Sequence, residues 1–238
     1  MTPDSSSGPT VLALDTSGSA GSAAVFRQGH VAAARFEIRS RGHAERLMPM
    51  IAEVLEEAAT SYQDITRLAV TVGPGSFTGV RVGLATARAL ALGLECPLLC
   101  LDSFALLAEQ AREARSGDED TDTPLAVLID SRRGDVFLRC YAASGAPLGS
   151  PEGCSPDALL ARLPRGPLRL AGDGAERALA LPELAEQPYR FVETARHCDA
   201  RSLAHWAARP SATDDSLAAA PLYLRAPDVS RPREASAQ

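Results

Sequence analysis

Three short apolar runs, separated by small and polar residues, open the chain. They cover Thr10–Asp15, Ser22–Arg27 and Val31–Ile38, and this pattern predicts three strands. From Ala44 to Ala59 the apolar residues instead recur every three or four positions, which predicts an amphipathic helix. Pro49 lies inside that pattern, so it either occupies the first turn of the helix or kinks it.

Strand and helix patterns then alternate. A strand at Leu68–Val72 leads through a glycine-rich loop, Gly73–Gly79, into a second helix, Val80–Leu94. Another strand, Pro97–Leu101, and a third helix, Ser103–Arg115, follow. The order β-β-β-α-β-α-β-α predicts a mixed sheet covered by helices.

The acidic segment Ser116–Thr123 contains no apolar residue, and we place a domain boundary there. A strand, a turn and a second strand follow it and repeat the opening of the first half. We therefore predict an N-terminal lobe over residues 1–115, a smaller C-terminal lobe over 116–225 and a disordered polar tail over 226–238. The elements expected in the second half are strands at Leu125–Asp130, Asp135–Tyr141 and Leu168–Ala171, and helices near Asp157–Leu163, Ala175–Leu181 and Ala200–Ala208.

Composition narrows the function classes. The formal net charge is −6, with 30 acidic and 24 basic residues, so the chain alone is a poor binder of nucleic acid. Every basic residue other than histidine is arginine, which excludes a Schiff-base lysine and the lysine of a P-loop. The five cysteines are odd in number and form no C-x-x-C pair, so we expect neither a structural zinc site nor a disulfide framework.

The N-terminal segment Met1–Pro9 lacks the basic start and the apolar middle of a signal peptide. The apolar runs are too short to span a bilayer. We therefore expect a cytoplasmic protein with no membrane contact.

Residues 73–83 read GPGSFTGVRVG, between a predicted strand and a predicted helix. The glycines and the proline predict a tight turn, and the amides at the helix start are available to an anion or a partner. The loop has neither the lysine of a Walker loop nor the spacing G-x-G-x-x-G. The loop alone therefore leaves an anion site and a structural turn both open.

The complete string closely resembles the hallmark of the TsaB (YeaZ) family. Other fragments of the family pattern follow in the same order: DTS at 15–17, HAERLMP at 43–49, DSRRGDVF at 130–137, GDG at 172–174 and PLYLR at 221–225. The resemblance spans about Val11 to Arg225, and it implies a proline at position 49.

The resemblance implies an α/β fold of two actin-like (ASKHA, RNase H-like) lobes, with mixed sheets flanked by helices. It also implies a non-catalytic subunit that dimerises with a TsaD-like catalytic subunit. That subunit carries the metal and transfers threonylcarbamoyl to the tRNA adenosine next to the anticodon. A TsaE-like ATPase completes the assembly, tRNA is contacted only through the complex, and a homodimer is possible.

The residues themselves argue against catalysis. Catalytic relatives of this fold hold a metal with two histidines one helical turn apart, whereas here His43 is followed four positions later by Leu47. One imidazole does not fix a metal, so we predict no metal site and no catalytic residue. An actin-fold ATP-dependent enzyme and a metallopeptidase-like hydrolase remain the alternatives.

Asp15 and Asp130 end the first strand of each predicted lobe. In actin-like ATPases such acids organise Mg-phosphate, so Asp15, Thr16, Ser17 and Asp130 are candidates for a vestigial nucleotide cleft. Alternatively, each acid only caps a turn. The expected glycines beside Asp130 are replaced by Ser131, Arg132 and Arg133. We therefore expect no bound cofactor and leave ATP binding open.

The helix Val80–Leu94 is apolar on all sides apart from Arg81 and Arg88, and glycine and alanine recur every fourth position from Gly79. Such a ridge allows a close approach of another element, either the sheet of the same lobe or a partner helix. In the family, the first two helices form a helical-bundle interface with TsaD or a second TsaB. The implied interface residues are His43, Leu47, Met50, Val54, Gly79, Gly83, Thr86, Ala87 and Leu90.

Overall fold

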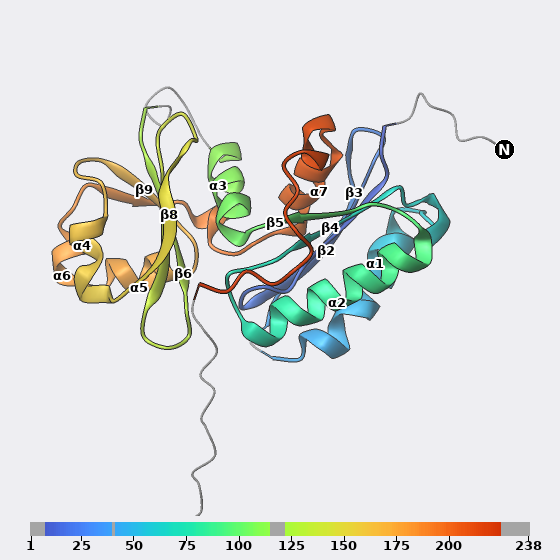
Figure 1. Ribbon diagram of the computed structural model, residues 1–238, viewed down its shortest axis with the longest axis horizontal. Helices are drawn as coiled ribbons and strands as arrows, with labels where there is room; N and C mark the ends of the chain where they lie inside the picture. Colours follow the sequence, from blue (N-terminus) through green and yellow to red (C-terminus); the bar gives the residue numbers. More distant parts are fainter. Residues whose placement is uncertain (1–7, 40, 115–121, 225–238) are drawn as a thin grey trace, which may run out of the picture.

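The computed structural model describes residues 8–39, 41–114 and 122–224, which form two five-stranded sheets (Figure 1). The first sheet has the order β3-β2-β1-β4-β5. Its strands are β1 (Val11–Asp15), β2 (Ala20–Arg27), β3 (His30–Ile38), β4 (Arg67–Thr71) and β5 (Leu98–Leu101). Strand β2 is antiparallel to both β1 and β3, whereas β4 runs parallel to both β1 and β5.

The second sheet repeats this arrangement with the order β10-β9-β6-β7-β8. Its strands are β6 (Leu125–Asp130), β7 (Val136–Tyr141), β8 (Pro147–Cys154), β9 (Leu168–Ala171) and β10 (Tyr189–Phe191). Here too the first three strands are antiparallel, and β9 is parallel to β6 and β10. The expected α/β fold of two actin-like lobes is confirmed.

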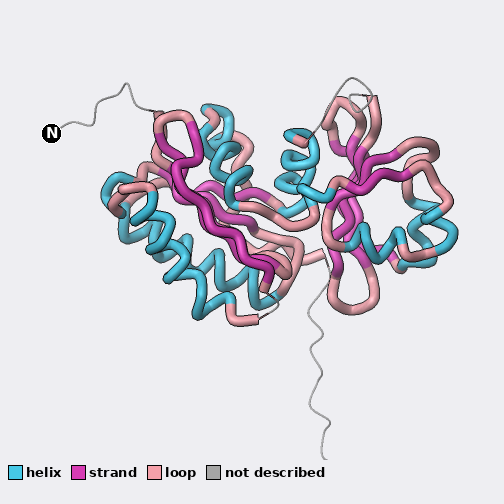
Figure 2. The backbone as a smooth tube through the Cα atoms, turned by 180° about the vertical axis from the view of Figure 1, so that it is seen from behind, coloured by secondary structure: helices cyan, strands magenta, loops and turns pink. Residues whose placement is uncertain are grey.

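Helices cover both faces of the first sheet. Helices α1 (His43–Glu57) and α2 (Phe77–Leu94) lie on one face, and α7 (Ala200–Ala208) lies on the other (Figures 1 and 2). Successive side chains of a strand point to opposite faces. Leu12 accordingly packs in the cluster under α1 and α2, and Ala13 in the cluster under α7. A strand buried on both faces needs no polar alternation, which explains the uniformly apolar residues 11–14 of β1.

The second sheet is flanked by α3 (Ser103–Glu113) on the side that faces the first lobe. Short helices cover its other face: α4 (Leu159–Arg162), α5 (Gly174–Leu179) and α6 (Pro182–Ala185). Four 3-10 turns complete the described elements: Tyr62–Asp64, Pro156–Ala158, Glu193–Ala195 and Pro210–Thr213.

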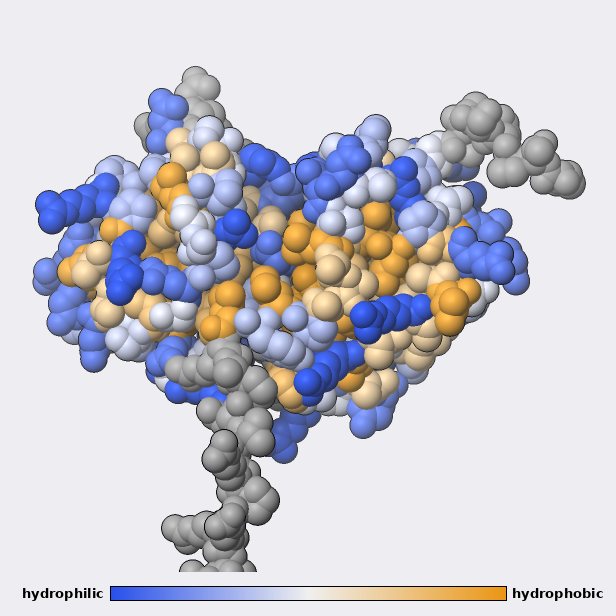
Figure 3. Space-filling view, viewed as in Figure 1, coloured by the Kyte–Doolittle hydropathy of each residue, from blue (hydrophilic) through white to orange (hydrophobic). Residues whose placement is uncertain are grey.

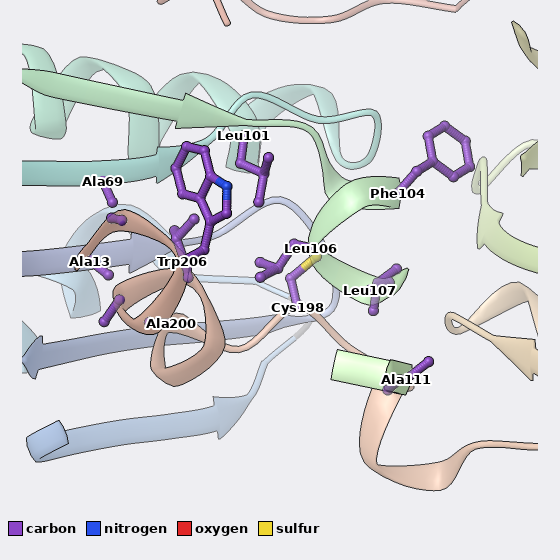
Figure 4. Packing of buried hydrophobic residues seen from close by; sticks show 14 of the residues in the cluster. Ala13, Ala69, Leu101, Phe104, Leu106, Leu107, Ala111, Cys198, Ala200 and Trp206 are labelled. Atoms are coloured by element: carbon purple, nitrogen blue, oxygen red, sulfur yellow. The ribbon is translucent and has the colours of Figure 1, made fainter. Parts of the chain in front are cut away.

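One buried cluster joins the two lobes. It contains Trp206 of α7, Phe104 and Leu107 of α3, and side chains from β1 and β6 (Figure 4). Figure 4 shows Cys198 within the same cluster, on the segment that leads into α7. Because this core is continuous, α3 and α7 hold the two sheets against each other.

The predicted C-terminal lobe over residues 116–225 is wrong in its last part. From α7 onward the chain returns to the first lobe: the Leu217 amide donates to the Cys100 carbonyl at 2.9 Å, and the Leu222 amide donates to the Val72 carbonyl at 2.7 Å. The apolar side of α7 covers a sheet face that α1 and α2 leave open. The predicted tail over 226–238 lies outside the described residues.

The structure excludes one of the two interpretations of Pro49 and corrects the start of one helix. Pro49 is the seventh residue of α1, so it does not occupy the first turn; it lies on the exposed side of the helix. Its missing amide leaves one carbonyl that water can reach. Helix α2 begins earlier than predicted, at Phe77, because the Ser76 side chain caps it by accepting from the Gly79 amide at 3.2 Å.

By length and composition α2 is apolar enough to cross a membrane. Its buried residues include Gly83, Leu84 and Ala87, which pack with the strands of the first sheet. A helix with one side on a sheet in this way is a packed helix of a globular lobe.

Candidate functional site

The carboxyl group of Asp15, at the end of β1, is enclosed by its own lobe. It accepts hydrogen bonds from the Ser17 amide at 3.2 Å, from the Ser17 hydroxyl at 2.7 Å and from the Thr71 hydroxyl. Burial raises the pKa of Asp15 to about 6, although these hydrogen bonds act in the opposite direction. The side chain therefore faces local hydroxyl groups and is shielded from solvent.

The glycine-rich loop lies flat against the turn that follows Asp15. The Ser76 amide donates to the Ser17 carbonyl at 2.6 Å, and the Thr16 hydroxyl donates to the Gly79 carbonyl at 2.7 Å. A Cβ atom at Gly75 would lie 2.1 Å from the Ser17 carbonyl oxygen, and one at Gly79 would lie 2.0 Å from that of Thr16. The glycines are thus required for close backbone approach, which favours the structural interpretation of the loop.

Asp130, at the equivalent end of β6, is held by cations. Its carboxylate accepts from the Arg132 amide at 2.8 Å and lies 3.6 Å from the Arg132 guanidinium and 3.7 Å from that of Arg177. Asp173 braces the same turn: it accepts from the Asp130 amide at 2.9 Å and pairs with Arg132 at 2.5 Å. Burial raises the pKa of Asp173.

The interlobe cleft between these two turns has a volume of about 20 Å³, which is about the room that one water molecule needs. Of the four predicted cleft residues, Ser17 and Asp130 line it, whereas Asp15 and Thr16 turn into the first lobe. The cleft thus has no room for a nucleotide in this conformation.

Three further groups meet at this cleft: Asp173, His197 and Cys198. The motif GDG at 172–174 is the sequence feature that points to Asp173. The structure shows why a glycine precedes Asp173: Gly172 has φ +90°, and a Cβ there would lie 2.0 Å from the Leu128 carbonyl oxygen. His197 and Cys198 carry no comparable sequence signal. Burial lowers the pKa of His197 and raises that of Cys198.

The predicted partner residues separate into two groups. Leu47, Met50, Val54, Gly79, Gly83 and Ala87 are buried within the first lobe, whereas His43, Thr86 and Leu90 are partly exposed. The glycine-alanine ridge of α2 therefore packs on its own sheet and not on the surface. A Cβ at Gly83 would lie 2.6 Å from the Thr16 hydroxyl oxygen and 3.6 Å from a Val70 methyl group.

The apolar residues that do reach the surface lie on the other side of the two helices. We call them the outer face: Met48, Pro49, Ala52, Ala85, Ala89 and Leu92. Arg81 and Arg88 are exposed on the same side of α2. Leu92 is 82% exposed. In Figure 3 apolar residues gather over the part of the surface that α2 forms.

His43 begins α1 and is half-buried beside Gly21, where a Cβ would lie 3.2 Å from the imidazole Nδ1. Burial lowers the pKa of His43. Within residues 8–39, 41–114 and 122–224, no group of three or more His, Cys, Asp or Glu side chains gathers as a metal site would require.

Comparison with known proteins gives the family. A family model described as "TsaD: tRNA N6-adenosine threonylcarbamoyltransferase" matches residues 36–198. The structure of YeaZ from Pseudomonas aeruginosa superposes with a TM-score of 0.76 at 28% identity, covering 91% of this chain and all of that one. The Escherichia coli (strain K12) protein named "tRNA threonylcarbamoyladenosine biosynthesis protein TsaB" is 39% identical over 131 residues. The chain belongs to the TsaD family, as a member of its TsaB (YeaZ) branch.

The matches to proteins named TsaB cover only part of the chain, whereas another match covers nearly all of it. The match to the Escherichia coli protein covers 55% of this chain and 54% of that protein, so the chain spans about half the length of the curated TsaB relatives it matches. An uncharacterized protein of Mycobacterium tuberculosis (strain ATCC 25618 / H37Rv) is 33% identical over 226 residues, or 92% of this chain and 93% of that protein. The likeness thus extends over both lobes.

Proposed function

We propose that this chain is a non-catalytic subunit required for threonylcarbamoyl modification of the adenosine next to the anticodon in tRNAs. It acts by dimerising with a TsaD-like catalytic subunit and supporting it. A TsaE-like ATPase joins the assembly, tRNA binds through the complex, and the site of action is the cytoplasm. The names of the TsaB relatives and the TsaD family model support this proposal.

The outer face of α1 and α2 is the observation that carries the proposal. Two adjacent helices expose small and apolar side chains there, including Met48 at 45% and Leu92 at 82% exposure. An apolar surface of this kind favours association. Methionine adapts to the shape of a partner, and the alanines allow a partner helix to come close. A second copy of this chain is the competing occupant of the face.

The cleft supports the non-catalytic part of the proposal. The carboxyl groups of Asp15 and Asp130 are engaged by groups of the chain itself, and the cleft between the turns that follow them has a volume of about 20 Å³. A reaction at this position would first require the lobes to separate.

Leu92→Glu tests the interface. A buried carboxylate at an apolar helix contact should weaken association with the TsaD-like subunit by about 2 kcal/mol, or roughly thirtyfold. Association is measured by calorimetry with the purified catalytic subunit. Threonylcarbamoyladenosine is measured in tRNA from the reconstituted system, and both readouts should fall together.

Leu148→Glu is the matched control and should behave as wild type. Leu148 is an exposed leucine on β8 of the second lobe. Normal association and normal modification with Leu92→Glu would reject the outer face as the interface. Modification that proceeds at full rate without this chain would reject the proposed function itself.

A further inference from the structure

A second and larger hollow lies beside the interlobe cleft, at the start of α2. Its volume is about 300 Å³, and it is lined by residues 74–78 of the glycine-rich loop, residues 131–133 of the β6–β7 turn and residues 222–224. This size is at the lower end of the range for small-molecule sites. We call it the α2 groove; the start of α2, whose first residues line it, approaches the second lobe in Figure 1.

Three aromatic side chains from distant parts of the chain meet in the α2 groove: Phe77, Phe137 and Tyr223. Phe77 and Tyr223 are 48% and 43% exposed, and their ring centroids are 5.7 Å apart. The Arg81 guanidinium lies 3.5 Å from the centroid of the Phe77 ring. Cation–π contact of this kind holds the ring in place, so the pair forms an ordered and half-exposed aromatic surface.

Among the described residues, the charged side chains that line the groove are Arg132 and Arg133. The carboxylates of Asp130 and Asp173, which pair with Arg132, are not among the lining residues. Arg132 is fixed by its ion pair with Asp173, yet its side chain is 48% exposed. The 18-residue helix α2 begins in the groove, and the N-terminus of a helix carries partial positive charge. On a chain of net charge −6, this local arrangement selects an anionic occupant.

We propose that the α2 groove binds an unpaired nucleotide of single-stranded RNA. The base lies against the Phe77–Tyr223 pair, and the phosphate lies near Arg133 and the first turn of α2. Aromatic surfaces beside a positive groove are the usual means by which proteins bind single strands. An acidic peptide matches the charge but has no need of a flat stacking surface. The proposal rests on the proposed function only for the source of the RNA, which would be a tRNA held by the complex. Because the net charge of the chain alone is −6, the groove by itself should bind RNA weakly, and saturation is expected only at high concentrations of the chain.

Fluorescence anisotropy with the full chain tests this site. The probe is a 5′-labelled single-stranded RNA hexamer at physiological salt, and the chain is used without any partner protein. Phe77→Ala and Arg133→Glu should each weaken binding roughly tenfold, as expected for the loss of one stacking surface or one phosphate contact. Phe77→Tyr, which keeps a ring, should bind as wild type.

Arg165→Glu is the matched charge control. Arg165 is exposed and shortly precedes β9. The first residues of β9 pair with the start of β6, whereas the 131–133 turn follows the end of β6, so Arg165 lies at the opposite edge of the sheet from the groove. This variant changes the net charge by the same amount as Arg133→Glu, so it should leave binding unchanged. Ultraviolet crosslinking of the same hexamer should label peptides that contain residues 74–81, 131–137 or 222–224.

Several results would overturn the proposal: no saturable binding by the wild-type chain, equal weakening by Arg165→Glu, or crosslinks confined to other surfaces. Displacement of the hexamer by an equal concentration of AMP would assign the groove to a free mononucleotide. Displacement by an acidic aromatic peptide would assign it to a protein partner. Because none of these measurements uses the catalytic subunit, failure here is distinct from failure of the outer face to bind it.

Discussion

Two aspartates at equivalent strand ends have different surroundings, and single residues create the difference. Asp15 is surrounded by the hydroxyl groups of Ser17 and Thr71, deep in its lobe. Asp130 is at the cleft and in contact with guanidinium groups of Arg132 and Arg177. The sequence shows both acids at the end of a strand, but it does not show which partners reach them.

The buried Asp15 should make stability depend on pH. Its pKa is raised to about 6 in the folded chain, whereas an unfolded Asp titrates near 3.9. Between these values the folded chain keeps a proton that the unfolded chain has lost. The contribution of this group is therefore fully present below about pH 4 and is lost as the pH rises through 6.

When the pH is raised from 5 to 8, only the step from 5 to about 6 lies in the range where the folded and unfolded chains differ in protonation of Asp15. This is about one pH unit, so the unfolding free energy should fall by about 1.4 kcal/mol. Asp15→Asn removes the titrating group, and it should gain about that much relative to wild type over the same interval. Urea unfolding at both pH values measures the difference. Asp157→Asn, at an exposed position, corrects for the loss of one negative charge. An equal pH dependence in wild type and Asp15→Asn would contradict the assignment.

At the scale of elements, α2 shows what a sequence pattern does and does not determine. The recurrence of glycine and alanine every fourth position correctly indicates that something approaches this helix closely. It does not specify whether a partner helix or the sheet of the same lobe makes that approach. The structure places the turn after β1 and strand β4 there, through Thr16 and Val70, because the loop before α2 is tied to that turn.

Gly83→Leu should therefore destabilise the chain. The added side chain would begin 2.6 Å from the Thr16 hydroxyl oxygen, and overpacking of this kind typically costs about 1–3 kcal/mol. The urea midpoint should fall, while the affinity of the folded fraction for the TsaD-like subunit should be retained.

Ala85→Leu places the same leucine side chain on the outer face of the same helix. It should change stability by less than about 0.5 kcal/mol, and its effect should appear in partner affinity instead. The opposite pattern, a stable Gly83→Leu chain that has lost its partner, would place the interface on the glycine-alanine ridge.

The elements of the first lobe follow from its sequence because their apolar patterns are strong. The buried apolar residues of β1 and α1 illustrate this, because they pack in one cluster: Leu12, Leu14, Leu47, Met50, Ile51 and Val54. The strands β8 and β10 were not predicted. Strand β8 reads PLGSPEGC, is mostly exposed and has no alternation of apolar and polar residues. Strand β10 has only three residues. Both are held by pairing with a neighbour at the sheet edge, which no local pattern reports.

The whole molecule brings together residues that are far apart in the chain. The cleft combines the turn after β1, the turn after β6 and the segment before α7. The α2 groove combines Phe77 with Tyr223. An aromatic and basic cluster of this kind was not expected from the sequence, because its members belong to three separate segments. The return of α7 to the first lobe was not predicted for a similar reason. The apolar face of α7 could cover either lobe, and only the structure shows that one face of the first sheet is otherwise uncovered.

The connection between the lobes also bears on ATP. In an active actin-like enzyme, Mg-phosphate would lie between the acids that end β1 and β6. Here the first acid is buried behind Ser17, the second is held by Arg132 and Arg177, and the cleft between the turns that follow them has a volume of about 20 Å³. Opening that space would expose part of the continuous cluster around Phe104 and Trp206, and burying apolar area is worth roughly 25 cal/mol per Å².

We therefore expect no ATP hydrolysis above background when phosphate release is followed with the purified chain and excess MgATP. Asp15→Ala is the control that identifies a contaminating ATPase, because a contaminant would be unaffected by it. Robust turnover that disappears in Asp15→Ala would show that the cleft opens and that the chain is an enzyme in its own right.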